Sequence, residues 1–180
     1  GDGYLNGTNE MPFYSTHGTH VAGIIAAKAG NGGVLGVASG GSTALANKIV
    51  SIAAIDIFSC IGENNDGTKF SSATVLDILY GLAKARDMGC SVVNMSLGFY
   101  TDDETCIAAL NEKTSELDEQ GVVQVCAAGN DHTAAKSYPA ACDATLSVIS
   151  LSKRGSIPGN SSTYSRKTWE SADAYMRSWF

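Results

Sequence analysis

Two histidines, His17 and His20, come just before a run of small apolar side chains at residues 21–27. If this segment is a helix, the two imidazoles share a face. Histidine has a pKa near neutrality, so one held rigidly at a helix start suits a general base. A metal site would need at least a third ligand, and no H-E-x-x-H motif is present. Two interpretations remain, a catalytic base and a pair of packed core histidines.

Small and polar residues end two predicted strands further along the chain. Two valines lie at or near the start of both SVVNMSLG (91–98) and VVQVCAAGN (122–130), and both segments finish with small or polar residues. In parallel sheets, ligands bind in the crevice outside the carboxyl ends of the strands. We therefore expect both segments to end at one crevice. For Asn130 taken alone, an ordinary turn is the competing interpretation, because Gly-Asn-Asp is good turn chemistry.

Helix and strand patterns alternate along the chain. Residues 72–88 have apolar side chains at helical spacing, and Gly89 follows as a helix stop. A second, polar-faced helix is predicted over residues 104–120. Buried strands are predicted at residues 49–57, 91–98, 122–130 and 146–151. This alternation is typical of a parallel sheet covered by helices, so the predicted class is α/β.

Composition excludes several classes of function. The chain has 180 residues, 44% of them hydrophobic, and a net charge of -6. These values indicate a globular domain and disfavour nucleic acid or anionic membrane as a partner. No apolar run approaches the roughly 20 residues of a membrane span. The five cysteines form no C-x-x-C pair, which disfavours a structural zinc site.

The segment HGTHVAGIIAA (17–27) resembles the histidine motif of the subtilisin-like serine proteases, the subtilases. Three further segments follow in the order of that family: GVLGVA (33–38), VVNMSLG (92–98) and VVQVCAAGN (122–130). The resemblance implies a three-layer α/β/α fold with a mainly parallel sheet, incomplete at both ends. We expect a single partial catalytic domain over residues 1–180. Its parts are a loop at 1–16, a matched core at 17–150 and a divergent tail at 151–180.

The resemblance also implies roles for individual residues. His17 would be the general base, His20 a packing residue and Asn130 the donor to the oxyanion. Two pocket walls and a segment that pairs with extended substrate supply the substrate-binding residues. These are Ser96, Leu97 and Gly98, then Ala127, Ala128 and Gly129, and finally Ser71, Ser72 and Ala73. For the last segment the competing interpretation is a helix start capped by Ser71 or Ser72.

Two of the three catalytic side chains of a subtilase have no match in these residues. Asp2 lies only 15 positions before His17 (17 − 2) and is too close for the aspartate motif. No Gly-Thr-Ser-Met-Ala motif follows Asn130. The prediction is a serine endopeptidase whose serine and aspartate lie outside this segment. The alternative is a truncated, inactive homologue that binds peptides or a partner. A nucleotide-binding domain is disfavoured, because no G-x-G-x-x-G opens a helix after a strand.

The remaining expectations concern cofactors, location and partners. No cofactor or metal is expected here, since Asn31 is the only side-chain oxygen in the loop KAGNGG, where many subtilases bind calcium. Calcium would belong to other parts of a longer protein. The resemblance implies a disulfide between Cys106 and Cys142 and a secreted or vesicular location, although no signal segment is present. Polypeptide substrates, a pro-region or an inhibitor are the expected partners of a monomer.

Overall fold

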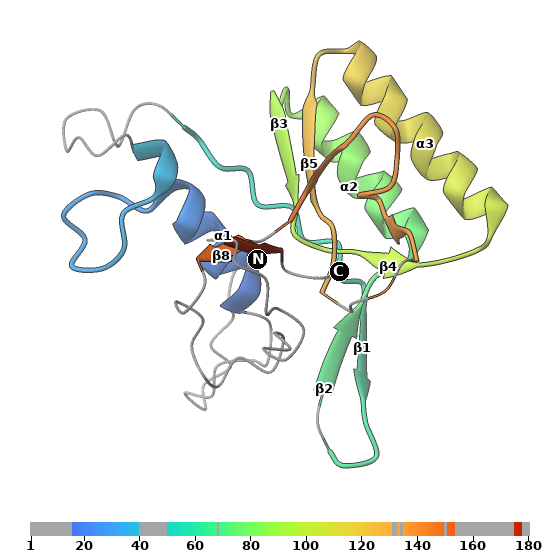
Figure 1. The fold of residues 1–180 in the computed structure, drawn as a ribbon, viewed down its shortest axis with the longest axis horizontal. Coiled ribbons are helices and arrows are strands. Elements are labelled where there is room, and N and C mark those ends of the chain that lie inside the picture. The colour runs from blue at the N-terminus through green and yellow to red at the C-terminus, as the bar shows by residue number, and fades with distance from the viewer. Residues whose placement is uncertain are drawn as a thin grey trace. The chain divides into compact units, whose positions relative to one another are not determined.

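The computed structural model describes residues 16–39, 50–67, 69–130, 133, 135–149, 151–153 and 175–177 (Figure 1). The chain divides into two compact units, Gly1–Ala85 and Arg86–Phe180. The loop expected at residues 1–16 lies outside the described residues except for Thr16, and so does most of the tail expected at 151–180. One partial catalytic domain over the whole chain therefore stays a prediction.

In the first unit, the described residues begin with the helix that carries both histidines. α1 spans Thr16–Ala26, so the predicted apolar helix exists and includes His17 and His20. A short 3-10 helix, η1, follows at Val37–Ser39. The strand predicted at residues 49–57 is wrong over its described part, because residues 50–59 adopt no regular structure. A strand needs a neighbour to complete its backbone hydrogen bonds. No described strand pairs with this segment.

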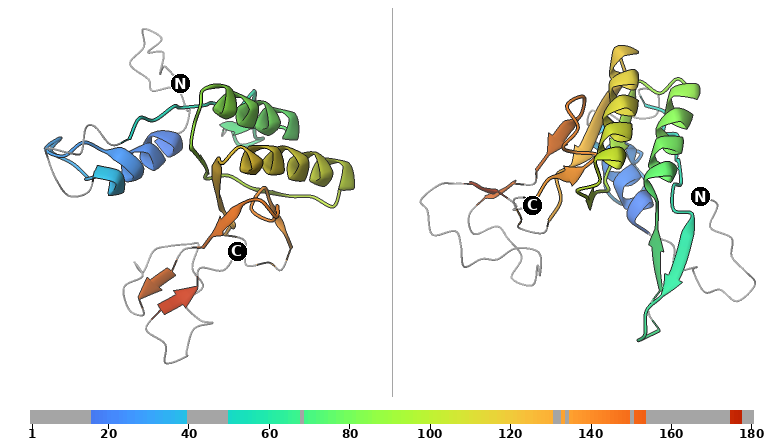
Figure 2. Two further views of the ribbon diagram at one scale, coloured as in Figure 1. Left: turned by 90° about the horizontal axis from the view of Figure 1, so that it is seen from above. Right: turned by 90° about the vertical axis from the view of Figure 1, so that its right-hand side faces the viewer.

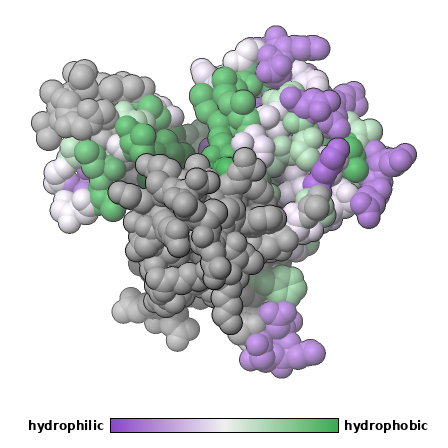
Figure 3. All heavy atoms as spheres, in the orientation of Figure 1, coloured by the Kyte–Doolittle hydropathy of each residue, from purple (hydrophilic) through white to green (hydrophobic). Residues whose placement is uncertain are grey.

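A hairpin takes the place of that strand. β1 (Cys60–Glu63) pairs antiparallel with β2 (Lys69–Ser72), with Cys60 opposite Ser72 and Glu63 opposite Lys69. Its turn is closed by a bond of 2.9 Å from the Gly67 N–H to the Asn64 carbonyl. Polar residues gather at this tip (Figure 3).

α2 (Val75–Asp87) confirms the helix predicted at residues 72–88. Its buried residues recur every three or four positions, as expected for one buried stripe of a helix. They are Ile78, Gly81, Leu82 and Ala85. Gly89 has φ +69° and its N–H bonds to the Arg86 carbonyl at 2.8 Å, so the predicted glycine stop is present.

The second unit is built on a parallel sheet. β3 (Val92–Met95), β5 (Val123–Ala127) and β7 (Leu146–Val148) are hydrogen-bonded in that order, with β5 in the centre. Both pairings are parallel. The α/β class is therefore confirmed. Two antiparallel pairs complete the described strands, β4 (Phe99–Tyr100) with β6 (Ser137–Tyr138), and β8 (Leu151–Lys153) with β9 (Tyr175–Arg177).

α3 (Glu104–Glu119) runs along one side of this sheet (Figure 2). The carboxylate of Asp103 caps the helix by accepting bonds from the N–H groups of Thr105 (2.8 Å) and Cys106 (3.3 Å). Leu110, Thr114 and Leu117 form its buried stripe. The Gln124 side chain on β5 donates to the Thr114 carbonyl at 2.7 Å, which ties the helix to the central strand. Among the described helices, none has the length and apolar composition to cross a membrane.

Leu110 lies at the centre of this core, and we predict that Leu110→Ala lowers the free energy of unfolding by about 2–5 kcal/mol. The Leu110 side chain is fully buried, so truncation leaves a cavity. Leu76 is 76% exposed and provides a matched control. Its replacement by alanine should change stability by less than about 0.5 kcal/mol. Urea unfolding of both variants measures the two free energies of unfolding. Equal losses of stability would contradict the placement of Leu110 in the core.

Candidate active site

The two strand ends of the second unit lie side by side. β3 and β5 pair in parallel with Met95 opposite Cys126, so both chains leave the sheet at the same edge. Ser96–Gly98 and Ala127–Asn130 follow directly. A Cβ atom built on Gly98 would lie 3.9 Å from the Ala127 carbonyl oxygen, so the two segments are in contact range. Both segments therefore end at the same edge of the sheet, and the crevice expected there stays a prediction.

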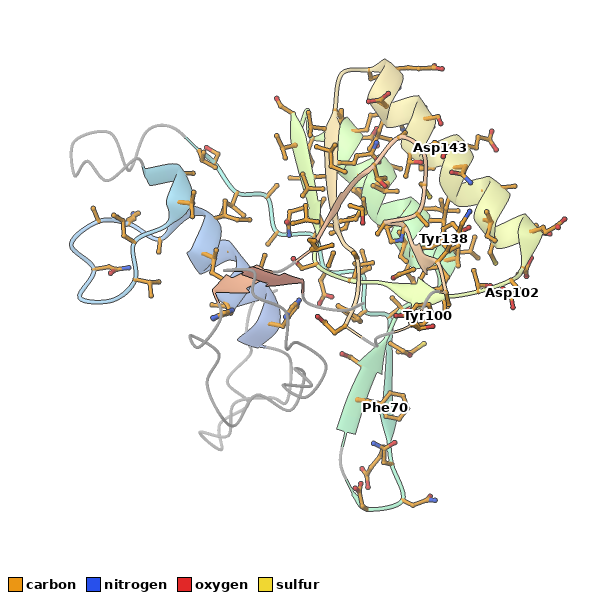
Figure 4. All side chains as sticks on the ribbon, viewed as in Figure 1. Phe70, Tyr100, Asp102, Tyr138 and Asp143 are labelled. Atoms are coloured by element: carbon orange, nitrogen blue, oxygen red, sulfur yellow. The ribbon has the colours of Figure 1, made fainter. Side chains whose placement is uncertain are left out.

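Gly98 has a steric reason to be glycine. A Cβ at this position would come within 2.6 Å of the Ser137 hydroxyl oxygen, closer than real Cβ contacts allow. Immediately after it, β4 pairs with β6, and Figure 4 labels Tyr100 and Tyr138 on these strands. A hydrogen bond of 2.9 Å from the Asn94 amide to the Ser96 hydroxyl orients the residue where this segment begins. The first predicted pocket wall, Ser96–Gly98, thus has a specific contact at its first residue and another at its last.

The second predicted wall continues from the central strand. The Ala128 N–H bonds to the Val148 carbonyl at 3.1 Å, which extends the β5–β7 ladder by one residue. Gly129 then has φ +102°, a conformation that L side chains rarely adopt. Asn130 follows and is exposed. Its side chain is therefore accessible at the end of the strand, as an oxyanion donor requires.

His17 lies in the first turn of α1, in the other unit, and is exposed. His20 lies one turn later and is exposed as well. The packing role predicted for His20 is therefore wrong, and the interpretation of two core histidines fails with it. The apolar run that follows the histidines is itself only half-buried over most of its length, so apolar composition alone did not predict burial of this helix.

The predicted substrate-pairing segment is the end of β2. Ser71 and Ser72 pair with Ile61 and Cys60 of β1, and Ala73 follows the strand. Neither serine caps α2. The cap is Thr74, whose hydroxyl accepts the Asp77 N–H at 3.2 Å and whose carbonyl accepts the Ile78 N–H at 3.2 Å. The T-x-x-D spacing of a capping box was the signal in the sequence for this arrangement.

The structure contains no bridge between Cys106 and Cys142, so that disulfide prediction is wrong for this structure. All five cysteines are free. Cys106 lies in the first turn of α3 beside Asp103, whereas the Cys142 thiol contacts Thr114. Thr114 is eight positions further along the helix (114 − 106). Eight residues of helix rise about 12 Å, beyond the reach of a disulfide.

The described residues do not show a metal site. No group of three or more His, Cys, Asp or Glu side chains gathers among them. The Asn31 side-chain oxygen, the one candidate ligand in the loop after α1, accepts the Gly33 N–H at 2.7 Å. It is thus engaged within its own loop.

Residues 1–174 match the family model described as the subtilase family, Peptidase S8. The chain belongs to the subtilase family. It is 35% identical over 144 residues to the major intracellular serine protease of Bacillus subtilis (strain 168), covering 77% of this chain and 39% of that protein. It is 36% identical over 124 residues to subtilisin Savinase of Lederbergia lenta, covering 69% and 38%. With the extracellular basic protease of Dichelobacter nodosus it shares 33% over 158 residues, covering 85% and 24%.

Among solved structures, it is similar to the psychrophilic subtilisin-like protease Apa1 from the Antarctic psychrotroph Pseudoalteromonas sp. AS-11. The identity is 35% and the TM-score 0.49, over 72% of this chain and 26% of that one. The chain therefore spans well under half the length of these subtilase relatives.

The cysteines allow a direct check of the thiol assignments. We predict that iodoacetamide modifies exposed Cys60 first and Cys126 last in the native protein. Burial raises the pKa of Cys126 to about 11. Because the thiolate is the reactive form, its labelling rate should rise about tenfold per pH unit below that value. Peptide mass spectrometry after timed labelling measures the order.

The same labelling tests the absence of the bridge. In denaturant without reductant, all five thiols should be modified. Two unmodified cysteines, with peptides of residues 106 and 142 joined, would show that the disulfide forms after all.

Proposed function

We propose that this protein is a subtilisin-like serine endopeptidase in which His17 is the general base and Asn130 the oxyanion donor. The serine and aspartate of the triad would lie outside residues 1–180. The single observation that carries the proposal is the contact between the two strand ends, Ser96–Gly98 and Ala127–Asn130, in a chain of the subtilase family.

In this mechanism the His17 imidazole accepts the proton of the serine hydroxyl as the oxygen attacks a peptide carbonyl. The imidazolium then protonates the leaving amine. The Asn130 side-chain amide donates a hydrogen bond to the carbonyl oxygen as it becomes negative. These roles agree with the exposure of both side chains, since each must reach a substrate.

The substrate would be an extended polypeptide. Ser96, Leu97 and Gly98 would form one wall of the pocket for the side chain before the scissile bond, with Ala127, Ala128 and Gly129 opposite. Ser71, Ser72 and Ala73 would pair with the substrate backbone by strand addition. In support, β1 and β2 form a two-stranded sheet, so the other edge of β2 has no strand partner among the described residues.

An extracellular or vesicular location is part of the proposal. Its support comes from relatives whose names describe extracellular proteases. One relative is an intracellular protease. Fractionation of the source organism into cells and medium, followed with an antibody, decides between the two locations.

We predict that the natural protein, isolated with its full length, reacts with a fluorophosphonate probe and hydrolyses peptides. Asn130→Ala should lower kcat by about 10²–10³-fold, the loss typical of one oxyanion donor. His17→Ala should abolish both probe labelling and hydrolysis. His20→Ala is the matched control, an exposed histidine on the same helix, and should retain activity.

Three results would contradict the proposal. If the wild-type protein bound peptides with no probe labelling and no hydrolysis, the alternative of an inactive peptide-binding homologue would replace it. If His20→Ala were as damaging as His17→Ala, the assignment of the base would be wrong. Unchanged kcat in Asn130→Ala would remove the oxyanion role from that side chain.

A further inference from the structure

One carboxylate oxygen holds both ends of the β1–β2 hairpin. Asp77 Oδ2, in the first turn of α2, accepts a bond of 2.8 Å from the Ser59 hydroxyl. The same oxygen accepts bonds of 2.7 Å from the Thr74 N–H and 2.7 Å from the Thr74 hydroxyl. Ser59 is the residue before β1, and Thr74 follows β2 after one intervening residue. A single atom therefore ties the strand that enters the hairpin and the strand that leaves it to one helix.

The bond to Ser59 distinguishes this arrangement from ordinary helix capping. A capping box involves only the cap residue and the side chain three positions later, here Thr74 and Asp77. Ser59 lies 18 positions before Asp77 and contributes nothing to the helix end. Its hydroxyl bond serves the hairpin alone.

The bonds act next to the predicted substrate-pairing segment. Cys60 pairs with Ser72 and Ile61 with Ser71, so the ladder pairs closest to the fixed ends contain both serines. Ala73 lies directly between that ladder and Thr74. Movement of either hairpin end relative to α2 would therefore shift the backbone edge that a substrate strand must match.

The carboxylate is well suited to this task. Hydrogen bonds from the Thr74 backbone, then from the Thr74 and Ser59 hydroxyls, lower the pKa of Asp77. The group is therefore ionised at neutral pH, and hydrogen bonds to an ionised acceptor are stronger than those between neutral groups. Three donors on one charged oxygen give the hairpin base a fixed geometry.

We propose that Asp77 is a positioning residue for extended substrates, which holds the Ser71–Ala73 edge in register for strand addition. This inference rests on the proposed peptidase function. Asp77 does not touch the reacting atoms. It acts through the backbone of the segment next to it, so its effect should depend on how much of the substrate reaches that segment.

The test compares two substrates of the full-length protein. One is a peptide with four residues before the scissile bond, and the other is a single-residue ester that does not reach residues 71–73. We expect Asp77→Ala to lower kcat/KM for the extended peptide by about tenfold, mainly through KM. The ester should change by less than about twofold. Asp77→Asn keeps one acceptor oxygen and should recover part of the loss.

Two variants act as controls. Ser59→Ala removes the hairpin bond and leaves the Thr74 capping box intact, so it tests the proposal even if Asp77→Ala fails to fold. It should lower kcat/KM for the extended peptide selectively, to a smaller extent. Asp103→Ala removes an equivalent helix cap, on α3, where Asp103 accepts the Thr105 N–H at 2.8 Å. It should leave the ratio between the two substrates unchanged.

The outcomes separate this inference from the proposed function. If the wild-type protein cleaves both substrates and Ser59→Ala and Asp77→Ala reduce both equally, Asp77 only supports the fold and the inference is overturned. A selective loss in Asp103→Ala would also overturn it, because any lost cap would then have the same effect. If the wild-type protein cleaves neither substrate, the proposed function fails, and this inference fails with it.

Discussion

The parallel pairing of β3 with β5 is the constraint on which the candidate site depends. It places Met95 opposite Cys126, so that the chain leaves both strands at one edge of the sheet. A shift of one residue in this register would turn every side chain of one strand to the other face. The register is set on the helix-facing side, where Met95, Gln124 and Cys126 are all buried. The chemistry proposed at the strand ends is therefore positioned by the packing of side chains one to six residues earlier in each strand.

Gln124 has an unusual part in that packing. Its amide nitrogen donates to the Thr114 carbonyl, but its side-chain oxygen is buried without a partner among the described residues. An unsatisfied buried acceptor is costly, and a hydrophobic residue would avoid the cost. The bond it does form fixes the position of the central strand along α3. Gln124 therefore positions β5 specifically, at some cost in stability.

Much of the fold could be predicted from the sequence wherever one physical signal dominated. The apolar stripe and the Gly89 stop correctly predicted α2. The adjacency of the two strand ends was predictable because consecutive strands of an α/β unit pair in parallel. The apolar run at residues 49–57 wrongly predicted a strand, because a hydrophobic segment forms a strand only where a neighbouring strand can pair with it. The β1–β2 hairpin was missed, since its residues do not alternate clearly between apolar and polar. The Cys106–Cys142 bridge was predicted from the position of both cysteines outside apolar runs and from the resemblance, but helix geometry separates those thiols.

The residues of the candidate site were named from sequence motifs and stay predictions, whereas the contacts that hold them could not be predicted. The motifs named His17 and Asn130, whereas Asp77 emerged only from three hydrogen bonds that link residues up to 18 positions apart. Within the two predicted pocket walls, some positions tolerate a change of side chain better than others. The positive φ of Gly129 favours glycine there, whereas a side chain at Gly98 would require the Ser137 hydroxyl to move. Ser96, Leu97, Ala127 and Ala128 carry no such constraint. In the proposed pocket, we therefore expect changes of substrate preference to arise from substitutions at those four residues.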